Sequence, residues 1–137
     1  MDVESGLEPD MQPNLDEFLL DRIAEDKRMA IHAATASGRE QWTVGDFHTP
    51  GPVQGKAAEH VARHDPARVL AECTARRRLV LACRDTGPEM AFLGSRPRGL
   101  PDFPLSPSDG HQLAALTLAL LAIPYADHSD YRPEWRP

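Results

Sequence analysis

The stretch EHVARHDPARVLAECTARRRLV (residues 59–80) contains the clearest boundary between structural elements in this chain, the step Asp65-Pro66. Aspartate is a favoured N-cap residue because its side-chain oxygen accepts a hydrogen bond from a free N–H of the first helical turn. Proline suits the first helical position, where its missing N–H costs nothing. The step therefore predicts a helix that begins at about Pro66 and ends near Arg84.

The residues before this boundary favour a small β-hairpin. An aromatic and β-branched group around Gly45 predicts a short strand, and the Pro-Gly-Pro sequence at 50–52 predicts a turn. Residues 56–62 would form the returning strand, with Val61 on the opposite face to its two neighbours. We therefore expect an antiparallel pair of strands ahead of the helix.

Two more helices are expected on either side of this region. The first covers residues 14–38, with an Asn cap at its start and Gly38 after its end. Its apolar residues fall on one face when projected at 100° per residue, and they are Leu15, Phe18, Leu19, Ile23, Ala30 and Ala33. The last helix starts after Asp109 and stops before Pro124. Leucines occur on nearly every side of it, which predicts burial on two faces.

These elements predict one small domain of the α+β class. The chain has 137 residues, which is enough for a single modest core. Residues 1–13 are polar and are expected to be disordered, and residues 14–137 form the domain. A connector at 85–109 holds five prolines and three glycines. The irregular tail after Pro124 is expected to pack back on the core through Tyr131 and Trp135.

Composition and cysteine spacing favour a cytoplasmic protein. The net charge of −6 and the pI of about 5.4 disfavour a general nucleic-acid coat protein, since phosphate binding needs a positive surface. Cys73 and Cys83 lie ten residues apart in one predicted helix, too far apart for a disulfide. The N-terminus lacks a signal-peptide pattern, and the apolar run at 113–123 is too short to span a bilayer. We expect no membrane association.

A buried polar cluster is predicted between the first two helices. Arg77 falls in the middle of the apolar stripe of the second helix, and a guanidinium in that position requires an acidic partner or a path to solvent. Asp26 lies at the centre of the apolar face of the first helix, with Arg22 beside it. We therefore predict a cluster of Arg22, Asp26 and Arg77.

The histidines leave two interpretations open. His60 and His64 are four residues apart and point the same way in a strand or a helix, and His128 in the tail could add a third ligand. Such a set suits Zn²⁺ or another transition metal with one position open to water, as in a metal-dependent hydrolase. In the alternative, His64 bonds to backbone near the helix cap, His60 packs on the hairpin, and no cofactor is bound.

Catalytic motifs are missing from the sequence. It contains no HExxH, CxxC pair, GxSxG, P-loop or GxGxxG pattern. A nucleic-acid surface on the second helix would use Arg68, Arg76 and Arg78, but a basic patch of this size is weak evidence by itself.

Three blocks of sequence resemble a family of small uncharacterised proteins of actinobacteria and their phages, a domain of unknown function. The blocks are LDEFLLDRIAED (15–26), HVARHDPARVLAECTARRRLV (60–80) and LLAIPYADHSDYRPEWRP (120–137). Some members of the family carry cysteines in the connector, which implies a metal knuckle there. This chain has no cysteine at 85–112, and the resemblance implies no catalytic residues for it.

The leading hypothesis is a non-catalytic interaction or regulatory protein that docks a protein partner. Charge complementarity and an aromatic anchor would drive the docking. The candidate surface consists of Arg63, His64, Arg68, Asp127, His128 and Tyr131. Metal binding through His60, His64 and His128, and nucleic-acid binding through the second helix, are the alternatives.

Overall fold

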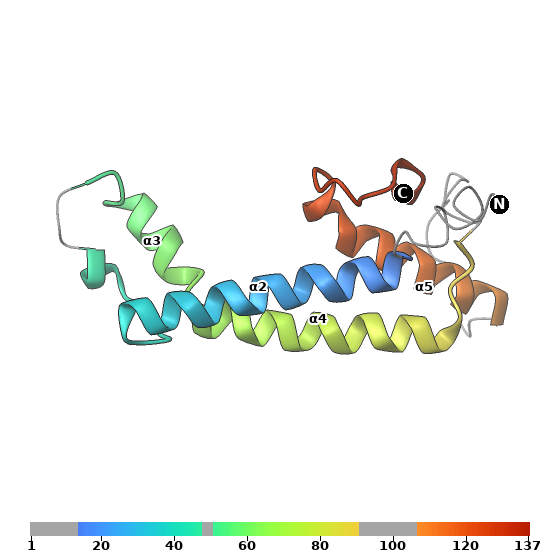
Figure 1. Ribbon diagram of the computed structural model, residues 1–137, viewed down its shortest axis with the longest axis horizontal. Coiled ribbons are helices and arrows are strands. Elements are labelled where there is room, and N and C mark those ends of the chain that lie inside the picture. Colours follow the sequence, from blue (N-terminus) through green and yellow to red (C-terminus); the bar gives the residue numbers. More distant parts are fainter. Residues whose placement is uncertain (1–13, 48–50, 91–106) are drawn as a thin grey trace, which may run out of the picture. The chain divides into compact units, whose positions relative to one another are not determined.

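The structure, a computed structural model, describes residues 14–47, 51–90 and 107–137, and helices make up most of them (Figure 1). The α-helices are α2 (Leu15–Ser37), α3 (Lys56–Arg63), α4 (Pro66–Thr86) and α5 (Pro107–Ala122). Three short 3-10 helices are η1 (Val44–Phe47), η3 (Ile123–Tyr125) and η4 (Pro133–Trp135). None of the four α-helices, as far as they are described, is both long and apolar enough to cross a bilayer.

The fold is all-α, and the prediction of an α+β fold with a hairpin is wrong. Within the described parts of the chain no residue lies in a strand, and Figure 1 draws no arrow. Residues assigned to the hairpin form η1 and α3 instead. In α3, Ala58 is buried while Val61 and Ala62 are half-buried, so the apolar positions follow i, i+3 and i+4, which is the helical spacing. An isolated two-stranded hairpin is also marginal in water.

The ends of α2 and α4 follow the predicted capping signals, whereas α5 begins at Pro107 and not after the predicted cap Asp109. The Asp65 side chain accepts a hydrogen bond from the backbone N–H of Arg68 at 2.9 Å, and Pro66 is the first residue of α4. Before α2, the backbone N–H of Asn14 donates to Glu17 Oε1 at 3.0 Å. After α2, Gly38 adopts a φ of 79°, a conformation that suits glycine at a helix end. The predicted boundaries of both helices are confirmed within two residues.

The described chain forms two compact units, which we treat separately. Unit 1 contains Met1–Arg22 and Arg78–Pro137, and unit 2 contains Ile23–Arg77. The boundaries fall inside α2 and α4, so each unit receives part of both helices. The predicted disordered tail 1–13 and most of the connector at 85–109 lie outside the described residues.

Unit 1 holds most of the buried apolar side chains of the described residues. Its members are Leu15, Phe18, Leu19, Val80, Cys83, Ala114, Ala115, Leu118, Ala119, Ala122 and Trp135. On α5 four alanines and Leu118 are buried, whereas Leu120 is 51% exposed. The small alanine side chains let α5 approach its neighbours closely. The prediction that Trp135 anchors the tail is confirmed, since this residue is 4% exposed.

Unit 2 has a thinner apolar core. Its buried apolar side chains among the described residues are Ile23, Ala30, Ala58 and Cys73, and three of these four are small. Polar contacts connect its segments instead. Asp65 Oδ2 accepts a hydrogen bond from the backbone N–H of Trp42 at 3.1 Å, and the Trp42 indole N–H donates to Ser37 Oγ at 3.0 Å. Unit 2 therefore depends on a few polar bonds around Trp42.

Candidate functional site

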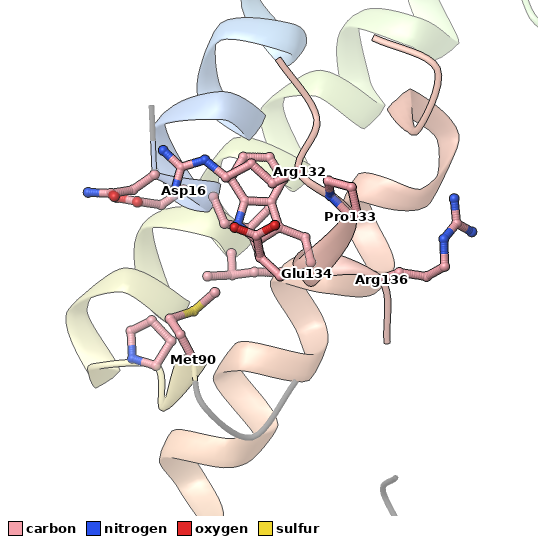
Figure 2. A pocket seen from close by; sticks show the side chains of 11 residues that line it. Asp16, Met90, Arg132, Pro133, Glu134 and Arg136 are labelled. Carbon is pink, nitrogen blue, oxygen red and sulfur yellow. The ribbon is translucent and has the colours of Figure 1, made fainter. Parts of the chain in front are cut away.

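A hollow of about 890 Å³ opens on unit 1 beside the C-terminal tail. Its apolar wall comes from four elements of the chain, and its charged residues come mainly from the tail (Figure 2). The lining residues are Asn14, Leu15, Asp16, Pro88, Met90, Leu118, Arg132, Pro133, Glu134, Trp135 and Arg136. Figure 2 shows the Glu134 carboxylate near the middle of this group, while Arg136 points away from it.

An aromatic cluster around Phe18 holds the tail in place in unit 1. The Phe18 ring is 1% exposed, and its centroid lies 5.1 Å from that of Trp135, 5.5 Å from that of His128 and 6.0 Å from that of Tyr131. The tilted and edge-to-face geometries are those that aromatic pairs favour. The ring of Tyr125, at 6.4 Å, completes the cluster. His128 and Tyr131, which were predicted to bind a partner, are therefore half-buried packing residues here.

Arg22 lies next to this aromatic cluster and is 8% exposed. Its guanidinium carbon sits 5.2 Å from the centroid of the Phe18 ring, a cation–π arrangement. Its Nη1 contacts both ring nitrogens of His128. The backbone N–H of Asp130 also donates to His128 Nδ1 at 3.0 Å, so Nδ1 acts as an acceptor. These bonds occupy His128 within unit 1.

The charges at the hollow of unit 1 are mixed in sign. Asp16 faces Arg84 at 3.9 Å, an ion pair whose partners are partly solvated and contribute little stability. The Arg132 guanidinium carbon lies 5.4 Å from the centroid of the Trp135 ring. Glu134 and Arg136 are exposed. The described residues of this hollow therefore combine carboxylates and guanidinium groups around the Trp135 ring.

A second hollow, of about 390 Å³, lies within unit 2. Segments of α2 and α4 line it together with the residues around Trp42 and the start of α4. The lining residues are Asp26, Met29, Ala30, Ala33, Trp42, His64, Pro66, Val69, Glu72 and Arg76. Met29 is 71% exposed, although it is a large apolar side chain, and Trp42 is half-buried. An apolar hollow with an exposed methionine, an aromatic ring and an arginine matches the composition of protein interfaces.

The rim of the unit 2 hollow carries more arginine than one carboxylate can pair. Glu72 lies 3.4 Å from Arg68 Nε and 3.9 Å from Arg76 Nη2, so two guanidinium groups share it. Arg63 is exposed at the end of α3, and its carbonyl oxygen accepts a bond from Arg68 Nη1 at 3.5 Å. Asp26 also lines the hollow, so the charges on this side of unit 2 are mixed in sign, with the arginines of the rim in excess of Glu72.

His60 and His64 stack on each other at the end of α3. Their ring centroids are 4.4 Å apart with an angle of 37° between the planes, and both residues are exposed. His64 Nδ1 donates to the carbonyl oxygen of His60 at 2.8 Å. The prediction that His64 bonds to backbone near the cap of the next helix is confirmed. The alternative for His60, packing on a hairpin, fails because α3 replaces the hairpin.

The two cysteines are buried, unpaired thiols. Burial raises the pKa of the Cys83 thiol, and a hydrogen bond with Thr117 opposes that shift. Burial also raises the pKa of the Cys73 thiol, to which Asp26 adds and which Arg76 opposes. A thiol whose pKa is raised carries little thiolate at neutral pH, so neither residue has the character of a nucleophile.

The structure divides the predicted site residues between the two units. In the partner-binding set, Arg63, His64 and Arg68 belong to unit 2, and Asp127, His128 and Tyr131 belong to unit 1. In the metal set, His60 and His64 belong to unit 2 and His128 to unit 1. Residues 14–47, 51–90 and 107–137 contain no group of three or more His, Cys, Asp or Glu placed to hold a metal ion. The three-histidine site and its cofactor stay predictions.

The predicted polar cluster is divided in the same way. Arg22 is in unit 1, where it contacts His128, while Asp26 and Arg77 are in unit 2. Asp26 lines the hollow of unit 2, and Arg77 is exposed. Of the arginines predicted for nucleic-acid binding, Arg78 is exposed. The cluster and the nucleic-acid surface therefore stay predictions.

The predicted site residues did not include Met29, which is 71% exposed and lines the hollow of unit 2. The helical spacing in the sequence indicated the position of Met29. Phe18 and Met29 are eleven residues apart, which is about three full turns at 3.6 residues per turn, so both residues lie on one side of α2. Trp42 was assigned to a strand, which hid its role as a wall of the unit 2 hollow.

Comparison with known proteins gives one match. The model of a family described as a family of unknown function, DUF6221, matches residues 12–137. No curated protein and no solved structure matches the chain. The matched range includes both hollows.

Proposed function

The chain belongs to DUF6221, a family of unknown function, and we propose that it is a non-catalytic interaction protein that binds a segment of a partner protein in the hollow of unit 2. The observation that carries this proposal is the 71% exposure of Met29 in a hollow also lined by Trp42 and His64. Large exposed apolar residues beside an aromatic ring and arginine are the usual anchors of binding surfaces.

The partner segment should be acidic and contain aromatic rings. Phe18 and Met29 share one side of α2, and in unit 1 the tail covers that side at Phe18. The covering tail, residues 125–135, contains three aromatic residues and three acidic residues against one arginine. A partner segment of similar composition would bury Met29 as the tail buries Phe18.

Charge supports the same class of partner. The pair Arg68 and Arg76 shares the single carboxylate of Glu72, and Arg63 lies exposed nearby. Carboxylates of a partner would pair with these guanidinium groups and raise the association rate. In this proposal Arg63, His64 and Arg68 of the predicted surface contact the partner. The half-buried His128 and Tyr131 keep the tail in place by packing on Phe18, and Asp127 is exposed in the same tail.

A cytoplasmic location is part of the proposal. It rests on Cys73 and Cys83, two buried thiols that are not paired, because oxidising compartments favour disulfides. The resemblance of residues 60–80 and 120–137 to proteins of actinobacteria and their phages makes an actinobacterial lysate the natural source of the partner.

The test compares matched substitutions on the two units. Full-length wild-type protein, Met29→Glu and Leu120→Glu are immobilised and exposed to the lysate, and bound proteins are identified by mass spectrometry. Leu120 is the control because it is a large apolar residue, 51% exposed, on unit 1. A protein retained by wild type and Leu120→Glu but lost by Met29→Glu is then purified, and its direct binding is measured.

The proposal requires two results from that purified pair. First, replacing Arg63 and Arg68 together with acidic residues must weaken binding. Second, a rising salt concentration must weaken binding by the wild-type protein, because salt screens partly exposed charge pairs. Equal binding by Met29→Glu and wild type would refute the proposal. Self-association that Met29→Glu abolishes would also refute it, since the occupant of the hollow would then be a second copy of the chain.

A further inference from the structure

The histidine pair at the end of α3 has a geometry that packing does not explain. His60 and His64 are both exposed, yet their rings lie with centroids 4.4 Å apart. The carbonyl oxygen of His60 accepts two bonds from His64, one from its backbone N–H at 3.2 Å and one from its ring Nδ1 at 2.8 Å. These two bonds fix the orientation of the His64 ring at the surface.

The bond from Nδ1 also fixes the tautomer of His64. A carbonyl oxygen only accepts hydrogen bonds, so Nδ1 carries the proton that it donates. In the neutral ring, Nε2 then has a free lone pair. Histidines that bind metals commonly donate their other ring N–H to a backbone carbonyl in this way, which orients the ring and raises its basicity.

We propose that His60 and His64 together bind a divalent transition-metal ion of the Zn²⁺ class. Imidazole nitrogen suits Zn²⁺, Ni²⁺ and Cu²⁺, whereas hard ions such as Mg²⁺ prefer oxygen. His64 coordinates through Nε2, and the ring of His60 supplies the second nitrogen. His128, which uses its ring nitrogens within unit 1, is not a ligand. The site has two protein ligands and leaves the remaining positions open.

This site shares His64 with the proposed docking hollow, but zinc binding does not require that a partner is bound there. The proposal depends only on the two rings and the carbonyl of His60. Two carboxylates adjoin the pair in sequence: Glu59, which faces Lys56 at 3.1 Å, and Asp65, whose oxygens accept bonds from the backbone N–H groups of Trp42 and Arg68. The geometry therefore supports a metal site with two histidine ligands. This site needs neither a residue of the C-terminal tail nor a partner protein.

The test uses full-length protein without a histidine tag, titrated with ZnCl₂ in a non-chelating buffer by isothermal titration calorimetry. His60→Ala and His64→Ala remove the two ligands in turn. His32→Ala is the matched control, because His32 is an exposed histidine on the helix α2. Circular dichroism of each variant verifies that helix content is unchanged.

We expect wild type to bind one Zn²⁺ and each ligand substitution to weaken binding by about tenfold or more, as loss of supporting groups already costs that much at metal sites. His32→Ala should match wild type. Zinc should also raise the melting temperature of wild type but not of the His60→Ala variant, because an ion that binds the folded state stabilises it. Absence of zinc binding in wild type, or binding as tight as wild type in either His60→Ala or His64→Ala, overturns the proposal.

Discussion

Phe18 and Met29 lie on the same side of α2, about three turns apart. In unit 1 the tail covers this side, and Phe18 is 1% exposed under the rings of Tyr131 and Trp135. In unit 2 the same side is open at Met29, which is 71% exposed. Within unit 1, the C-terminal tail therefore contributes to the burial of Phe18.

The comparison shows how the stability of the protein is distributed. All four of the largest fully buried side chains of the described residues, Phe18, Leu19, Val80 and Leu118, belong to unit 1. Unit 2 buries mainly small side chains and uses Asp65 and Ser37 to hold Trp42. Apolar burial is the larger stabilising contribution, so unit 1 should resist unfolding more than unit 2. The following substitutions test this difference.

The largest effect is expected from Phe18→Ala. This change removes the ring that four tail residues contact and leaves a cavity, which should lower the free energy of unfolding by about 3–5 kcal/mol. Urea denaturation followed by circular dichroism measures it. Leu120→Ala, at an exposed position of the same unit, is the control and should change the free energy by less than about 0.5 kcal/mol. A similar loss in both variants would show that the aromatic cluster does not stabilise unit 1.

A smaller effect is expected from Asp65→Ala in unit 2. The substitution removes the cap of α4 and the acceptor of the Trp42 N–H, and loss of an N-cap costs about 1–2 kcal/mol. Thermal and urea unfolding measure the change. Asp65→Asn should retain most of the stability, because asparagine caps helices as well as aspartate does. If Asn destabilises as much as Ala, the charge of Asp65 and not its capping bond is the important property.

We expect the two buried thiols to cause a loss of stability at alkaline pH. The pKa values of Cys73 and Cys83 are raised above the ordinary 9.0, chiefly by burial. The folded chain therefore keeps these protons at pH values where the unfolded chain has released them. Their contribution is complete below about pH 9.0 and is lost as the pH rises through the folded pKa values.

Urea unfolding between pH 8 and pH 11 measures this loss. The double substitution Cys73→Ala and Cys83→Ala should give a shallower decline than wild type over that range, whatever its stability at neutral pH. Parallel curves for the two proteins would mean that the thiols do not contribute.

The smallest effect on stability is expected from Met29→Ala. An exposed side chain contributes little to folding, so the free energy of unfolding should change by less than about 0.5 kcal/mol. The same denaturation experiment measures it beside Phe18→Ala. A loss above about 1 kcal/mol would indicate that Met29 is buried in solution, for example in a dimer, and would remove the contrast between the two units.

Part of the candidate site could be read from the sequence, and part could not. The position of His64 next to a helix cap predicted its bond to backbone, which the structure contains. The set that combined Arg63, His64 and Arg68 with the tail was chosen from charge and from an aromatic anchor in the tail. Spacing along the chain cannot tell that Tyr131 packs against Phe18 while Met29 remains open, since both depend on where the tail folds.

Local signals determined the ends of the helices. Asn14 and Gly38 bound α2, and Asp65-Pro66 starts α4, because capping bonds form between residues only a few positions apart. The helical spacing of Ala58, Val61 and Ala62 was also present in the sequence, although a strand was predicted there. Only the tertiary structure decided that the alanines of α5 are buried beside an exposed Leu120 and that the tail covers Phe18, because these outcomes depend on contacts between segments distant in sequence.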